Sequence, residues 1–152
     1  MKLSEYLEPD LVGLDLPGSN KEDVLSELVE LLAGRGIVHD APALLATLEE
    51  REGLGSTGIG HGVAIPHGRC AELTRAAVAF GRTAGEVDFT AIDGKPTRLF
   101  FLLVAPEGGT QEHLHILAKI ARLTRNANTR EQLLVAESPS RVLEVIDAAE
   151  GS

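Results

Sequence analysis

The segment LFFLLVA, from Leu99 to Ala105, is the longest uninterrupted apolar run in the chain. A strand with one face toward solvent would alternate apolar and polar residues, and this run does not. It is also far too short to span a bilayer, which takes about 20 residues in a helix. We therefore expect a central strand covered on both faces, within an α/β fold in which helices flank a small mixed β-sheet.

The segments on either side of this run alternate between strand-like and helix-like patterns. Shorter strands are predicted at Leu11–Leu16, Val63–His67 and Ala76–Gly81. Helices are predicted to begin at a capping box of Ser19 and Glu22, at Asp40 with Pro42 in the first turn, over Gln111–Arg125, at a capping box of Thr129 and Gln132, and at Ser138-Pro139. We expect one continuous domain over residues 1–152.

Composition excludes several classes of function. Aromatic residues make up only 3% of the chain and its formal net charge is −9, so neither base stacking nor phosphate neutralisation favours a nucleic-acid partner. Cys70 is the only cysteine, which rules out an internal disulfide and a thiolate metal cluster. The N-terminus lacks an apolar leader, so we expect a cytoplasmic protein without direct membrane insertion.

His67 is the first candidate for chemistry. It follows the apolar residues of VAIPH and lies just after a glycine-rich stretch, GLGSTGIGHG, that contains Ser56 and Thr57. Such a loop brings backbone N–H groups close to an anion, and a histidine beside it suggests phosphoryl chemistry. Two plainer interpretations stay open: a histidine that merely ends a strand, and a flexible surface loop.

Helical periodicity distinguishes two further histidines in QEHLHIL. At about 100° per residue, His113 falls on the apolar face together with Leu114 and Ile116, whereas His115 falls on the opposite side. His113 could therefore donate a hydrogen bond to a phosphate on His67. It could equally be a core histidine bonded to a backbone carbonyl, and the residues alone favour neither.

The stretch RExxGSTGIGxGVAIPHG, from Arg51 to Gly68, closely resembles a family signature, and HLHILAKIARL, from His113 to Leu123, matches a second one. Both belong to type-2 enzyme IIA domains of the phosphoenolpyruvate-dependent sugar phosphotransferase system. This is the fructose/mannitol class, and the chain is most similar to its nitrogen-regulatory branch. The resemblance covers the whole chain in length and element order.

The resemblance implies a three-layer α/β/α sandwich and a phosphocarrier without a cofactor or metal. In such a protein His67 accepts a phosphoryl group on Nε2 from phospho-HPr or an HPr homologue, which makes the chain a phosphotransferase component with a phosphohistidine intermediate. His113 matches the second active-site histidine. Arg51 matches an arginine that lines the site, and Ser56 and Thr57 occupy loop positions that support the phosphate or orient His67.

Three functions remain as alternatives. The first is regulatory: the chain binds target proteins according to its phosphorylation state, which its beginning with methionine and ending after one domain favours. The second is sugar-specific, in which an enzyme IIB receives the phosphoryl group for fructose or mannitol uptake. The third, more distant, is a metal-binding protein that uses His61, His67, His113 and His115, although His113 and His115 project from opposite sides of one helix.

Overall fold

A computed structural model describes residues 2–151 as a mixed six-stranded sheet with helices on both faces. The strands are β1 (Val12–Leu16), β2 (Gly58–Gly60), β3 (Val63–Ala64), β4 (His67–Arg69), β5 (Ala77–Val87) and β6 (Thr97–Ala105). The helices are α1 (Lys21–Gly34), α2 (Ala41–Leu54), α3 (Thr110–Leu123), α4 (Ala127–Val135) and α5 (Pro139–Gly151), after two short 3₁₀ turns at Leu3–Glu5 and Pro9–Leu11. The expected fold class is confirmed.

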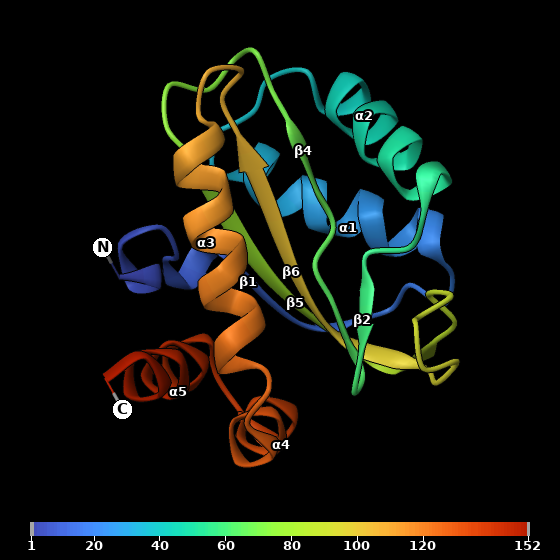
Figure 1. Ribbon diagram of the computed structural model, residues 1–152, viewed down its shortest axis with the longest axis vertical. Coiled ribbons are helices and arrows are strands. Elements are labelled where there is room, and N and C mark those ends of the chain that lie inside the picture. Colours follow the sequence, from blue (N-terminus) through green and yellow to red (C-terminus); the bar gives the residue numbers. More distant parts are fainter. Residues whose placement is uncertain (1, 152) are drawn as a thin grey trace.

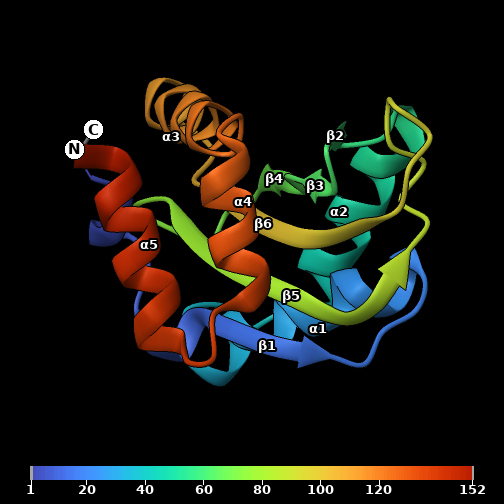
Figure 2. The ribbon, with the colours of Figure 1, turned by 90° about the horizontal axis from the view of Figure 1, so that it is seen from below.

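The sheet has the order β1-β5-β6-β3-β2, and β4 also pairs with β6. β5 runs antiparallel to β6, whereas β1, β3 and β4 lie parallel to their neighbours, which makes the sheet mixed. α3, α4 and α5 cover one face of the sheet, and α1 and α2 cover the other (Figure 1, Figure 2). This is the three-layer sandwich that the family resemblance implies.

β6 is the centre of the core, as its apolar run predicted. Every residue from Leu99 to Ala105 is at most 1% exposed. Phe101 packs edge to face with Phe80 of β5, with 5.0 Å between ring centroids, and Phe100 does the same with Phe89 at 5.2 Å. The strand needs no polar side because helices cover both of its faces.

The predicted strand Val63–His67 is interrupted in the structure. β3 ends at Ala64, and pairing with β6 resumes at His67 and continues to Arg69. Pro66 has no N–H to donate to the ladder, although its carbonyl still accepts from the N–H of Leu103 at 2.9 Å. His67 therefore begins a strand instead of ending one.

Both predicted capping boxes are wrong, because each helix has a different N-cap residue from the one predicted. α1 is capped by Asn20, whose side chain accepts from the N–H of Asp23, and not by Ser19 with Glu22. α4 begins about one turn earlier than predicted, with Asn126 as its cap, so that Thr129 is a buried residue inside the helix. Asparagine caps as well as serine or threonine, so either polar neighbour could have started these helices.

The remaining helix starts agree with the sequence. Asp40 caps α2, with proline in the first turn, and the Ser138 hydroxyl accepts from the N–H of Arg141 ahead of α5. Within the described part of the chain, no helix combines the length and the apolar character that crossing a membrane requires.

Candidate functional site

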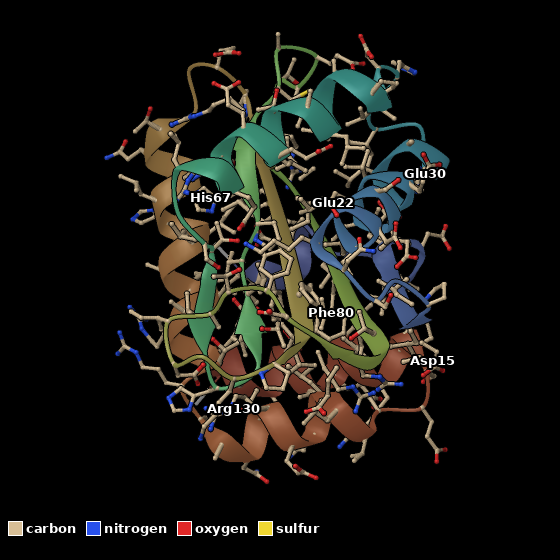
Figure 3. All side chains as sticks on the ribbon, turned by 90° about the vertical axis from the view of Figure 1, so that its right-hand side faces the viewer. Asp15, Glu22, Glu30, His67, Phe80 and Arg130 are labelled. Carbon is tan, nitrogen blue, oxygen red and sulfur yellow. The ribbon has the colours of Figure 1, made fainter. Side chains whose placement is uncertain are left out.

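Strand β4 directs His67 toward the α3 face of the sheet. Successive residues of a strand point to opposite faces. At Gly68 a side chain would meet Thr47 and Leu48 of α2, at 3.2 and 3.3 Å. His67 on one side of Gly68, and Arg69 on the other, therefore project to the face that α3 covers. In Figure 3, His67 lies well away from Arg130 of α4, the helix that follows the C-terminal end of α3.

The ring of His67 is held in one tautomer. Its Nδ1 lies 2.8 Å from the carbonyl oxygen of Ile65. A carbonyl can only accept, so Nδ1 must carry the hydrogen, and in the neutral ring the free electron pair is on Nε2. Because β3 ends at Ala64, the Ile65 carbonyl is outside the ladder and can accept from the histidine. The local fold therefore makes Nε2 the nucleophilic atom.

His113 lies opposite His67, in the first turns of α3. The two ring centroids are 5.3 Å apart, and the rings are inclined at 70°. His113 is only 8% exposed, and its buried Nδ1 has no hydrogen-bond partner among residues 2–151. The alternative of a core histidine bonded to a backbone carbonyl through that nitrogen is not what the structure shows. A buried polar atom without a partner, in a ring that packs against a second histidine, is typical of a functional site.

Burial, followed by the charges of the neighbouring His67 and Arg69, lowers the pKa of His113 to about 4. The N-terminal end of α3 also disfavours a positive charge at this position. His113 is thus a neutral imidazole at neutral pH. A neutral ring can donate one hydrogen bond to an anion without adding a charge of its own.

This lowered pKa predicts a pH-dependent stability. Between pH 6.5 and about 4, the unfolded chain protonates His113 and the folded chain does not, so the stability that neutral His113 provides is complete above pH 6.5 and is lost as the pH falls through that window. We expect a loss of at most about 3 kcal/mol in the free energy of unfolding. Urea unfolding of the wild type and of His113→Gln from pH 7.5 to 4 measures it. Parallel pH profiles for the two proteins would contradict the prediction.

Arg69 is a charged residue near this site that the sequence did not single out. It shares the α3 face with His67, and its guanidinium donates to the Pro106 carbonyl and to the Thr110 hydroxyl, each at 3.2 Å. The sequence does contain a signal for it. In the segment PHGR, successive strand residues point to opposite faces, so the arginine two residues after the histidine lies on the same face. It was missed because the strand was expected to end at His67.

The three other predicted site residues form hydrogen bonds within and around the glycine-rich loop. Arg51, in the last turn of α2, donates to the Gly55 carbonyl at 2.8 Å. The Ser56 hydroxyl donates to the Phe89 carbonyl and also accepts from the N–H of Gly58. The Thr57 hydroxyl donates to the carboxylate of Glu52. These bonds fix the shape of the loop, and a direct role of these residues toward a phosphate stays a prediction.

Glu52 is the buried carboxylate that organises this loop. It is 9% exposed, accepts from the backbone N–H of Thr57 as well as from its hydroxyl, and forms an ion pair with Lys21 of α1 at 3.4 Å. Lys21 in turn lies 5.0 Å from the centre of the Phe89 ring. The loop before β2 is thereby tied to both helices of its layer.

The helical wheel of α3 was right for three of the four residues that it placed, His113, His115 and Ile116, and wrong for Leu114. His113 is buried and His115 is exposed, as predicted. Leu114 is 58% exposed, however, because the buried face is narrower than the wheel suggested and comprises His113, Ile116, Ile120 and Leu123. Among residues 2–151, no group of three or more histidine, cysteine or acidic side chains lies close enough to hold a metal ion.

Comparisons with known proteins agree with this arrangement. Residues 5–149 match the family model described as "Phosphoenolpyruvate-dependent sugar phosphotransferase system, EIIA 2". The chain is 37% identical over 147 residues to the fructose-specific EIIABC component of Bacillus subtilis, a match that covers 97% of this chain but only 23% of that protein. It is 35% identical over 146 residues to a nitrogen regulatory protein of Pseudomonas aeruginosa, covering 96% of this chain and 95% of that one.

A solved structure shows the same similarity in three dimensions. The nitrogen regulatory protein IIA-Ntr of Neisseria meningitidis superposes with a TM-score of 0.87 at 38% identity, over 95% of this chain and 98% of that chain. Identities to the regulatory and the fructose-specific relatives thus fall within a few per cent of one another.

Proposed function

This chain belongs to the EIIA 2 family of the phosphoenolpyruvate-dependent sugar phosphotransferase system, and we propose that it carries a phosphoryl group on Nε2 of His67. As a member of this family it is a phosphoryl-transfer component. The observation that supports the proposal is that the Ile65 carbonyl holds the proton on Nδ1 of His67, which leaves Nε2 as the nucleophile. A neutral His113 lies beside it, with 5.3 Å between the two ring centroids.

The chemistry is an in-line transfer between two nitrogen atoms. The electron pair on Nε2 of His67 attacks the phosphorus of a donor phosphohistidine, the donor's P–N bond breaks, and its electron pair returns to the donor ring. Imidazole is a competent nucleophile when it is neutral, so positioning and charge stabilisation make up most of the protein's contribution. His113 would donate to a phosphoryl oxygen, and its neutrality lets it do so without making phospho-His67 too stable to pass its group on.

The donor in this proposal is phosphorylated HPr or an HPr homologue, and the chain works in the cytoplasm. We favour a regulatory destination, in which target proteins bind according to the state of His67. The similarity to nitrogen regulatory proteins in sequence and in solved structure supports this choice. The similar identity to fructose-specific proteins, among them both an EIIABC component and a separate EIIA component, supports the second candidate, transfer to an enzyme IIB.

Labelling with a complete donor system tests the proposal. We expect phosphoenolpyruvate, enzyme I and HPr, or the nitrogen-branch homologues of enzyme I and HPr, to place one phosphoryl group on each chain. The label should be lost in acid and survive in base, as a phosphoramidate does, and fragment mass spectrometry should place it on His67. A label on another residue, or no label from either donor system, would overturn the assignment.

Addition of an enzyme IIB to the labelled chain then separates the two destinations. Loss of label to a fructose-class or mannitol-class IIB at a rate similar to loading supports the sugar-specific branch. Retention of label in its presence supports the regulatory branch.

A further inference from the structure

We propose that Arg69 is a positioning residue for this site, which fixes the start of α3 and places a permanent positive charge on the sheet face that carries His67 and lies beneath His113 of α3. The part of the proposal that concerns transfer rests on the function proposed above. The part that concerns His113 does not, because it can be measured in the unphosphorylated protein.

The guanidinium of Arg69 joins strand β4 to the turn that starts α3. Nη1 donates to the carbonyl of Pro106, the residue that follows β6, and Nη2 donates to the hydroxyl of Thr110, the first residue of α3. One side chain thus holds both ends of the turn. A lysine could not make both bonds with one fixed planar group.

Backbone hydrogen bonds extend this tether to His113. The Pro106 carbonyl that Arg69 binds also accepts from the N–H of Gly109, at 3.0 Å, and the Gly109 carbonyl accepts from the N–H of His113, at 3.0 Å. The turn is tight, since a side chain at Gly109 would approach the Pro106 ring to 2.8 Å. A displacement of the Pro106 carbonyl would therefore displace the first turn of α3 and the ring of His113 with it.

The charge of Arg69 is not neutralised by an ion pair. Among residues 2–151, each described salt bridge involves other residues, and both bonds of Arg69 go to uncharged acceptors. In a chain of net charge −9, an unpaired arginine beside two histidines is a local excess of positive charge. Such a charge favours an anion on this face, and it opposes protonation of His113, whose pKa it helps to lower.

The direct test follows the ring protons of His113 by NMR during a pH titration of the unphosphorylated protein. We expect Arg69→Gln to raise the pKa of His113 by roughly 0.5 to 1, as removal of one nearby charge does in a partly hydrated site. Thr110→Val keeps the charge but removes one acceptor, and should leave this pKa near that of the wild type. Arg125→Gln, an exposed residue after α3, changes the net charge equally and should do the same.

Transfer kinetics test the tether. Arg69→Gln should slow phosphoryl transfer to His67 about tenfold or more, and Thr110→Val should slow it less, while Arg125→Gln should match the wild type. Melting curves show whether each variant is folded at the assay temperature. If Arg69→Gln does not fold, Arg69→Lys carries the test: it should keep the low pKa of His113 but transfer more slowly than the wild type.

The outcomes separate this proposal from the function it rests on. An unchanged pKa of His113 together with unchanged transfer in folded Arg69→Gln would overturn the role of Arg69. If the wild type itself takes up no phosphoryl group, the proposed function fails, and the NMR titration still decides whether Arg69 sets the protonation of His113.

Discussion

We expect His67→Ala to take up no phosphoryl group under conditions in which the wild type is fully labelled. The physical reason is that the 2.8 Å bond between Nδ1 of His67 and the Ile65 carbonyl leaves the electron pair of the neutral ring on Nε2, the atom proposed to accept the phosphoryl group. The loss should be complete and not merely a slower rate, because the atom that forms the P–N bond is removed. Acid-labile label on a gel and the intact mass of the protein both measure it.

His115→Ala is the matched control, since it removes an exposed histidine two residues from His113 on the opposite side of α3. It should label like the wild type. His113→Ala should label, but more slowly, because it removes a hydrogen-bond donor and not the nucleophile. Undiminished labelling of folded His67→Ala would contradict the assignment of the nucleophile.

Phe101→Ala should cost about 3–5 kcal/mol of unfolding free energy, the typical loss when a large buried aromatic is truncated. Phe101 lies at the middle of β6, is fully buried, and packs edge to face on Phe80. Helices cover both faces of β6, so its neighbours cannot close the resulting cavity without moving a helix layer. Urea unfolding at pH 7.5, followed by circular dichroism, measures the change.

Ile92→Ala provides the comparison, because it also shortens an apolar side chain but at a position that is 85% exposed. Its effect should stay within about 0.5 kcal/mol. A loss below about 1 kcal/mol for Phe101→Ala would mean that β6 is not the centre of the core.

Much of the site could be predicted because its signals are local. The inward orientation of His113 and the outward orientation of His115 follow from the helical repeat, which needs no knowledge of the rest of the molecule. Leu114 was misplaced because the width of a buried face depends on the neighbouring layer, which periodicity alone does not describe. The N-caps of α1 and α4 were misplaced for a different reason: adjacent polar residues offered nearly equal caps, and packing selected Asn20 and Asn126.

The hydrogen-bond partners in the glycine-rich loop could not be predicted from local sequence. The residues Ser56 and Thr57 suggested hydroxyl groups offered to a ligand, yet both donate to protein acceptors, one of them the buried carboxylate of Glu52. The sequence shows which side chains can donate a hydrogen bond. It does not show their acceptors, because these belong to segments that only folding brings near the loop, such as the Phe89 carbonyl 33 residues away.

The sequence by itself determined the covered central strand and the helices on both sides of it, and it selected His67 and His113 as the candidate pair of histidines. Apolar runs, helical repeats and a long motif are all properties of the chain in order. Tertiary structure alone decided the rest. β4 pairs with β6 beyond Pro66, and this pairing puts Arg69 on the same sheet face as His67. The packing of α3 against β6 buries His113 and places it beside His67. These relations join segments about 40 residues apart, and only the closing of the sheet and its helix layers sets the distance and the electrostatics between them.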